Sequence, residues 1–215
     1  MERTIVKRSL RKLALMAGTM FVTFGLAVVP AFANPSTTWT ANPNPAAISG
    51  VNSGYMSLTA GVPLVCTQYS VQGSMYSAGG NPATVATLGT LTFGSIASPC
   101  QSALGGASFT ASAPWRFVAR DYNPATGVTS GYLEGVQLRV AVSACQFTTM
   151  GKASATYRNS TGILSVNSVP GELAVISALG CGATITTGTL PVLRGNFLIK
   201  IFGTSTAPIL VGSNP

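Results

Sequence analysis

The feature that most constrains the fold of this chain is the alternation of apolar and polar side chains over short stretches. In Val136–Val142 every second residue is apolar, and the residues between are polar or small. This period of two is typical of a β-strand with one buried face. A second stretch, residues 115–120, places Trp115, Phe117 and Ala119 on one face in the same way. After residue 34 no stretch has the 3.6-residue period of an amphipathic helix, so we expect an all-β fold.

Turn-forming residues separate the expected strands. Asn123–Gly127 and Asn159–Gly162 each end in glycine, which adopts a positive φ at little cost, and Pro170–Gly171 forms a third turn. Val128–Leu133 is expected to form a hairpin across the first of these turns, and Phe197–Phe202 a strong last strand. About ten short strands with regular turns predict a Greek-key sandwich or a small barrel.

The first 33 residues have the three parts of a secretory signal peptide. Five basic residues precede an apolar run that ends at Pro30, and Ala31-Phe32-Ala33 matches the small-residue pattern before a cleavage site. The run contains glycine and threonine and ends at a proline, which makes it a poor membrane-spanning helix. We therefore expect cleavage after Ala33 and export of the remaining chain.

The exported part is expected to contain a single β domain, residues 55–203. Residues 34–54 are rich in proline, asparagine, serine and threonine, and we expect them to form an extended segment that leads into the domain, with Trp39 as an anchor in its core. Residues 204–215 are expected to form a C-terminal tail. No 20-residue apolar stretch follows the signal peptide, so no transmembrane segment is expected.

The distribution of charge argues against nucleic acid as a partner. Five of the twelve basic side chains and one of the four acidic ones lie in residues 1–33, which leaves seven and three in the exported part. These seven are scattered along the sequence, whereas proteins that follow a phosphate backbone cluster their basic residues. No binding to nucleic acid is expected.

Four cysteines, Cys66, Cys100, Cys145 and Cys181, follow the signal peptide, and in an exported chain this predicts two disulfides. Of the three possible pairings, the spacing favours Cys66 with Cys100 and Cys145 with Cys181. A zinc site is disfavoured because the chain has no histidine and no C-x-x-C pair. The two spans also resemble each other in layout, through either a diverged duplication or the recurrent geometry of two β-meanders.

The sequence lacks the groups of common hydrolases. Without histidine, Ser-His-Asp and Cys-His catalysis are impossible, and most zinc enzymes are excluded. Asp121 and Glu134 could approach across the expected hairpin as a glycosidase pair, although acids that flank a turn are more often structural. Lys152 and Lys200 are candidates for a Ser–Lys dyad, but no S-x-x-K motif accompanies them. We therefore predict that the chain is not an enzyme and uses no metal and no cofactor.

An aromatic and basic surface is the candidate binding site. Arg116 and Arg120 lie close in sequence to Trp115 and Tyr122, and Tyr132 lies on the other strand of the expected hairpin. Aromatic rings stack on ligands, and arginine binds carboxylates through paired hydrogen bonds. These five residues predict a surface for a sugar or an anionic polymer. The alternative is that Trp115 belongs to the core, because it follows a proline on an alternating strand.

Several of these motifs together resemble a group of small secreted actinobacterial proteins with four cysteines. The motifs are Pro114-Trp115, Tyr122-Asn123, Thr126–Gly131, Tyr157–Gly162 and Gly180-Cys181. A more distant similarity, in the cysteine-containing strands only, is to the exported proteins called activators of alkane oxidation. The resemblance covers roughly residues 60 to 200. It implies an exported, actinobacterial-type β-protein, supports the same cysteine pairing, and brings no catalytic residues.

These observations predict a secreted or envelope-associated, non-enzymatic β-protein that acts by surface contact or self-assembly. Its partners would be cell-envelope components or further copies of itself. The alternative is an extracellular binding module for a carbohydrate or an apolar small molecule. Exposure of Trp39, Trp115 or Tyr132 in one cluster would favour binding, whereas burial of both tryptophans beside a flat serine and threonine face would favour assembly. Close contact of Asp121 with Glu134 in a cleft would favour an enzyme.

Overall fold

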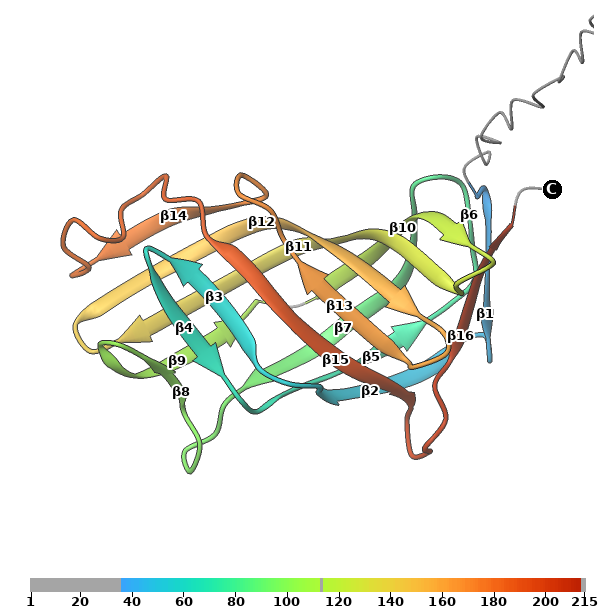
Figure 1. Cartoon of the computed structure of the whole chain (residues 1–215), viewed down its shortest axis with the longest axis horizontal. Helices are drawn as coiled ribbons and strands as arrows, with labels where there is room; N and C mark the ends of the chain where they lie inside the picture. The colour runs from blue at the N-terminus through green and yellow to red at the C-terminus, as the bar shows by residue number, and fades with distance from the viewer. Residues whose placement is uncertain (1–35, 113, 214–215) are drawn as a thin grey trace, which may run out of the picture. The chain divides into compact units, whose positions relative to one another are not determined.

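The computed structural model describes residues 36–112 and 114–213, which form sixteen β-strands (Figure 1). The predicted signal peptide, residues 1–33, lies outside the described residues. The all-β fold predicted from the alternating pattern is confirmed. Across residues 36–112 and 114–213, no helix is long and apolar enough to cross a membrane.

The strands range from two to fifteen residues in length. In chain order they are β1 (Thr38–Asn42), β2 (Ala46–Asn52), β3 (Met56–Ala60), β4 (Val62–Cys66), β5 (Tyr69–Met75), β6 (Ala78–Gly79), β7 (Ala83–Phe93), β8 (Cys100–Ser102), β9 (Gly105–Ala111), β10 (Trp115–Asn123), β11 (Val128–Val142), β12 (Cys145–Arg158), β13 (Ile163–Asn167), β14 (Leu173–Leu179), β15 (Val192–Ile201) and β16 (Ile209–Ser213).

Strand β11 is longer than the sequence predicted because a β-bulge divides its pattern. The register between β11 and β12 shifts between Leu133 and Val136, and Gly135 within the bulge has a φ of 71°. An extra residue in a bulge reverses which alternate positions face inward. Thr129 and Leu133 are buried before the bulge, and Val136 and Leu138 after it. The sequence therefore shows two short strands where the structure has a single long one.

Thirteen of the strands form one antiparallel sheet that closes on itself. Neighbouring strands run from β12 through β13, β15, β2, β5, β7, β10 and β11, and β11 pairs again with β12. Strands β9, β8, β4 and β3 continue the wall beyond β10, and β3 pairs with β15. Closure removes most exposed strand edges, which a weakly charged β-protein must protect. Of the two predicted architectures, the structure has the small barrel.

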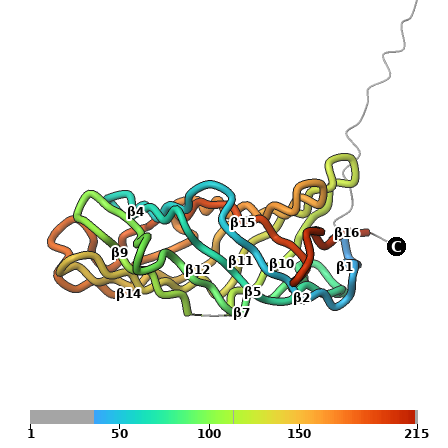
Figure 2. The backbone as a smooth tube through the Cα atoms, turned by 90° about the horizontal axis from the view of Figure 1, so that it is seen from below, coloured from blue at the N-terminus to red at the C-terminus, as the bar shows by residue number. Residues whose placement is uncertain are grey.

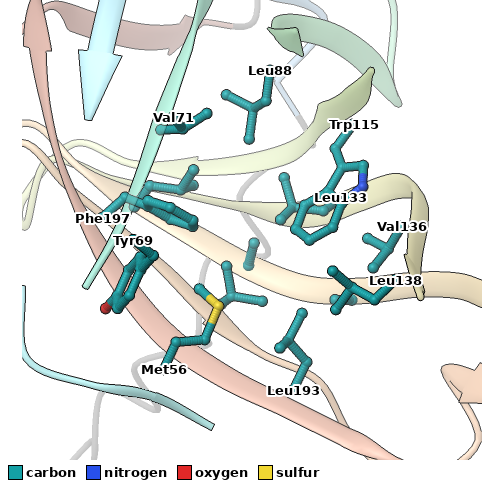
Figure 3. Close-up of a cluster of buried hydrophobic side chains, with 14 of the residues drawn as sticks. Met56, Tyr69, Val71, Leu88, Trp115, Leu133, Val136, Leu138, Leu193 and Phe197 are labelled. Atoms are coloured by element: carbon teal, nitrogen blue, oxygen red, sulfur yellow. The ribbon is translucent and has the colours of Figure 1, made fainter. Parts of the chain in front are cut away.

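Apolar side chains fill the inside of the barrel (Figure 3). Trp115, Leu133 and Leu138 are fully buried, and Tyr69 packs edge-on against Phe197 with ring centroids 5.0 Å apart. A barrel wall of eight strands encloses an interior that side chains can just fill. The interior of the barrel is therefore packed with apolar side chains, and the polar side chains of the wall lie mainly on the outer faces of the strands.

A second sheet of three strands joins the two ends of the described chain, with β1 between β16 and β6. Figure 2 shows β1 and β16 side by side at one end of the molecule. Trp39 is buried, and its indole N–H donates a hydrogen bond to the Gly80 carbonyl at 3.0 Å, as expected of an anchor. The structure differs from the expected domain bounds, because residues 34–54 contain β1 and β2, and residues 204–215 contain β16. All three strands belong to one compact unit, Asn34–Pro215. Strands β1 and β16 are only five residues long, so their pattern is weak in the sequence.

Both predicted disulfides are present, Cys66–Cys100 and Cys145–Cys181. One cysteine of each disulfide belongs to a single row of paired residues across neighbouring strands. The row runs from Cys100 in β8 through Ala107 in β9 and Val142 in β11 to Cys145 in β12. The two disulfides therefore lie at the same end of the barrel, away from the sheet of β1, β6 and β16 (Figure 1). Disulfides of this kind indicate an oxidising compartment.

The turn between β12 and β13 holds β16 in place. The side-chain amide of Asn159 donates a hydrogen bond to the Leu210 carbonyl at 2.8 Å and accepts one from the Leu210 N–H at 2.9 Å. The Tyr157 hydroxyl donates to the Pro208 carbonyl at 2.6 Å. The amide of Asn159 thus provides hydrogen-bond partners for the N–H and carbonyl of Leu210, as a neighbouring strand would do.

Replacing Asn159 with alanine is expected to lower the free energy of unfolding by about 1–3 kcal/mol, because the N–H and carbonyl of Leu210 lose their partners. Urea denaturation followed by circular dichroism measures this change. Asn159-Ser160-Thr161 also matches the N-glycosylation triplet. Thr161→Ala is therefore the matched control, since it removes the triplet but keeps the amide. An equal loss in both variants would contradict the assignment to the hydrogen bonds of Asn159.

Candidate functional site on the outer face of the barrel

The outer face of β10, β11 and β12 carries two exposed basic side chains beside a half-buried tyrosine. Tyr132 of β11 lies opposite Val118 of β10 and opposite Ser154 of β12. Arg120 and Lys152 are each two residues away from these partners on their own strands. Diagonal neighbours of this kind are within reach of long side chains, so both cations can contact the same ring.

Arg120, Tyr132 and Lys152 form a cation–tyrosine cluster. The guanidinium carbon of Arg120 lies 5.0 Å from the centroid of the Tyr132 ring, and the ammonium nitrogen of Lys152 lies 5.6 Å from it. Each contact of this kind at an exposed site contributes about 0.5–1 kcal/mol. Among the described residues, neither cation forms a salt bridge, whereas Arg116 pairs with Glu134 at 3.4 Å. The cluster therefore presents two positive charges whose donors are free.

Glu172 lies next to this cluster, in the turn before β14. Its carboxylate accepts hydrogen bonds from the Ser154 N–H at 2.8 Å, the Ser154 hydroxyl at 2.6 Å and the Val169 N–H at 3.1 Å. Burial by itself raises the pKa of this carboxyl, but the hydrogen bonds and the nearby Lys152 outweigh burial and leave the pKa below its ordinary value. The ionised carboxylate of Glu172 therefore connects the turn before β14 to β12 through hydrogen bonds.

Because the pKa of Glu172 is lowered in the folded protein, its stabilising effect is complete above its ordinary pKa of 4.5 and is lost as the pH falls through the folded value. Glu172→Gln is therefore expected to cost about 1 kcal/mol at pH 7 and less at pH 3. Urea denaturation of both proteins at the two pH values measures this. Glu134→Gln is the control, because the exposed Arg116–Glu134 pair contributes little at either pH. An equal loss at both pH values would contradict the assignment.

Two of the five residues predicted for the binding surface do not lie on it. Trp115 is fully buried in the core (Figure 3), because it belongs to the inward face of an alternating strand. Tyr122 lies opposite the buried Thr129 and packs against the core. Arg116, Arg120 and Tyr132 do lie on the outer face. The prediction that Trp115 contributes to a binding surface is therefore wrong, and the alternative that it belongs to the core is confirmed.

The carboxylates of Asp121 and Glu134 do not meet. Asp121 lies opposite Ser130, and Glu134 lies opposite Arg116. Ser130 and Glu134 are four residues apart on β11, or about 13 Å along the strand, whereas glycosidase carboxylates are about 5–9.5 Å apart. The carboxylate of Asp121 accepts a hydrogen bond from the Tyr122 N–H at 2.9 Å. This arrangement does not support the glycosidase hypothesis.

Beside the cation–tyrosine cluster, a shallow depression crosses β11, β12 and β13. We call the outward polar residues that line it the polar band: Ser130, Ser154, Thr156, Ser165 and Asn167. The pairing places them in register, since Thr156 lies opposite both Ser130 and Ser165. A second depression shares Ser165 and Asn167 and continues to Arg194, Asn196 and Tyr55. The two depressions together therefore run from β11 to β15.

Sequence reasoning missed Lys152 as a partner of Tyr132, and it missed the polar band. The alternation in Lys152–Thr156 does show which residues face outward, but the signal that joins them to Tyr132 is the β11–β12 register, which a bulge shifts. Of the described residues, no group of histidine, cysteine, aspartate and glutamate could hold a metal ion. Comparison with known proteins adds no assignment, because no protein-family model, curated protein or solved structure matches this chain.

Proposed function

We propose that this chain is a secreted or envelope-associated, non-enzymatic protein that acts through contacts made by its outer surface. The observation that carries the proposal is the packed interior, in which Trp115 and other large apolar side chains fill the barrel, while Trp39, on strand β1 of the second sheet, is buried as part of the same core. A barrel that carries a small molecule inside needs an interior space for it. Partners of this protein would therefore bind to the outer faces of the strands.

Self-assembly is one form of surface contact, and strand β14 supports it. β14 pairs only with β12 along its length, and it contains no charged residue. Its side chains Ile176 and Leu179 are 48% and 74% exposed. Uncharged apolar edge strands are sites where another copy of a chain can add. The loop before β15 satisfies the backbone of Val175, which leaves Ile176–Leu179 as the open part of the edge.

The proposal is tested by mixing the oxidised protein with insoluble cell envelopes from a Gram-positive actinobacterium and by sedimentation velocity of the protein alone. We expect saturable binding to the envelopes or concentration-dependent oligomers. Ile176→Lys should weaken oligomers that form through β14, whereas Ala125→Lys, which adds the same charge in an exposed turn, should not. A protein that stays monomeric and does not bind to envelopes would contradict the proposal.

The second candidate function is an extracellular carbohydrate-binding module. The cation–tyrosine cluster and the adjoining polar band favour it, since they bring together charged, aromatic and hydroxyl groups on one exposed face. Both functions are forms of surface contact, but they would use different parts of the barrel. Carbohydrate would bind to β11–β13, and self-assembly would use the edge of β14.

A further inference from the structure

We infer that the polar band and its two cationic ends form a binding site for an acidic polysaccharide chain. This inference rests on the proposed function as a surface-contact protein and names the ligand class of one surface. The site begins at the cation–tyrosine cluster of Arg120, Tyr132 and Lys152, crosses the polar band, and ends at Arg194.

Free hydrogen-bonding groups are the first support for this site. The side chains of Ser130, Thr156, Ser165 and Asn167 make no hydrogen bond to any other described residue, and Ser130, Thr156 and Asn167 are exposed. Ser154 is the member of the band whose hydroxyl is engaged, with Glu172. Hydroxyl and amide side chains both donate and accept, which matches the hydroxyl groups of a sugar.

Positive charge at both ends of the band is the second support. Arg120 and Lys152 lie at one end, and Arg194, which has no salt bridge among the described residues, lies at the other, opposite Asn167. Strands β11 and β15 are separated by three strand spacings, or about 14 Å. Two charged ends at this separation suit a chain of several acidic sugars better than a single small anion.

An exposed aromatic ring is the third support. Tyr132 contacts both cations at one end of the band, and Tyr55, in the second depression at the other end, is 66% exposed. An exposed tyrosine ring offers an apolar face with a polar edge, which suits the face of a pyranose ring. Two carboxylates lie near the site, and both accept hydrogen bonds from the protein: Glu172 from the Ser154 and Val169 N–H groups, and Asp121 from the Tyr122 N–H.

The charge density favours an acidic glycan over nucleic acid. Three cations spread over the site are fewer than a phosphate backbone requires, since nucleic-acid sites place many basic residues along the strand. Carboxylates spaced along a glycan match cations at the two ends, and the sugar hydroxyls between them match the polar band. Arginine binds carboxylates through two parallel hydrogen bonds, which makes a polyuronate the best probe.

The test measures binding of the oxidised, exported protein to polygalacturonate by isothermal titration calorimetry, with dextran as a neutral glycan and dextran sulfate as a general polyanion. Intact mass first verifies that residues 1–33 are absent, because their basic residues would attract any polyanion. We expect binding to polygalacturonate and not to dextran. The double variant R120S/K152S and the single variant R194S should each weaken it at least tenfold, since each removes a charged hydrogen-bond donor.

R139S is the control matched in charge to R194S, and it removes one positive charge from the outer face of β11 on the far side of the bulge. Arg139 donates a hydrogen bond to Gln146 and does not line the polar band. R139S should bind as the wild type does, and Tyr132→Phe should bind better than Tyr132→Ser, because phenylalanine keeps the ring that orients the cations. Thermal unfolding verifies that each variant is folded.

Absence of binding to polygalacturonate would overturn the inference, as would equal losses in R139S and R120S/K152S, which would indicate general attraction of a polyanion. Equal or tighter binding to dextran would overturn the acidic character of the ligand. The envelope and sedimentation experiments distinguish this failure from failure of the proposed function, because they measure surface contact without reference to a glycan.

Discussion

Replacing Trp115 with alanine is expected to lower the free energy of unfolding by about 3–5 kcal/mol, which is the largest effect we expect from a single substitution. Trp115 has no exposed surface and lies in the centre of the barrel, with its ring 6.2 Å from that of Phe93. Truncation would leave a cavity between strands that pair on both sides of β10, so the walls cannot collapse to fill it. Urea denaturation of the oxidised protein measures the loss.

The matched control for this prediction is Trp115→Phe. The indole Nε1 of Trp115 is buried and has no hydrogen-bond partner among the described residues, so its removal takes away an unsatisfied donor and offsets part of the lost packing. We therefore expect Trp115→Phe to cost less than half as much as Trp115→Ala. Similar losses in the two variants would contradict the prediction, because they would show that the phenylalanine ring restores none of the packing that Trp115 provides.

Removing the disulfide Cys145–Cys181 with the double substitution C145A/C181A is expected to lower the free energy of unfolding by about 4 kcal/mol. The disulfide closes a loop with a sequence separation of 36 residues, and the chain-entropy model gives about this value for such a loop. C66A/C100A should cost a similar amount, because its separation is 34 residues. Differential scanning calorimetry without reductant measures both losses.

Reduction of the wild-type protein is the control for the disulfide prediction. With both disulfides reduced, the loss should exceed that of either double variant, because two loops are opened. A double variant as stable as the oxidised wild type would contradict the prediction and would show that strand pairing already restricts the unfolded chain at that site.

The parts of the fold that could be predicted are those with local causes. Asn123–Gly127 forms the expected turn, with the Asn123 side chain accepting hydrogen bonds from the N–H groups of Ala125 and Thr126. Val128–Leu133 pairs across it with β10, and Asn159–Gly162 joins β12 to β13 as expected. These turns and the hairpin depend on residues that are close in sequence, so the local sequence pattern is sufficient to predict them.

The parts that could not be predicted depend on pairing between distant segments. The Pro-rich beginning of the described chain gives little sign that β1 pairs with β16, because the partner lies more than 150 residues later. For the candidate site, alternation showed that Arg116 and Arg120 face outward, but the same alternation should have assigned Trp115 to the core. Tyr132 meets Lys152 only through the register of β11 with β12, which sequence alone does not fix.

The pairing of the first strands with the last has a consequence for the order of events in biogenesis. β1 pairs with β16 and β2 pairs with β15, so neither has its full set of neighbours until the final segments have emerged. A chain threaded from its N-terminus would remain open while it crosses a membrane, since these contacts of long sequence separation form late and slowly. In an exported chain this topology would delay folding until translocation is complete, and shortening the chain at either end should trap it in the open state.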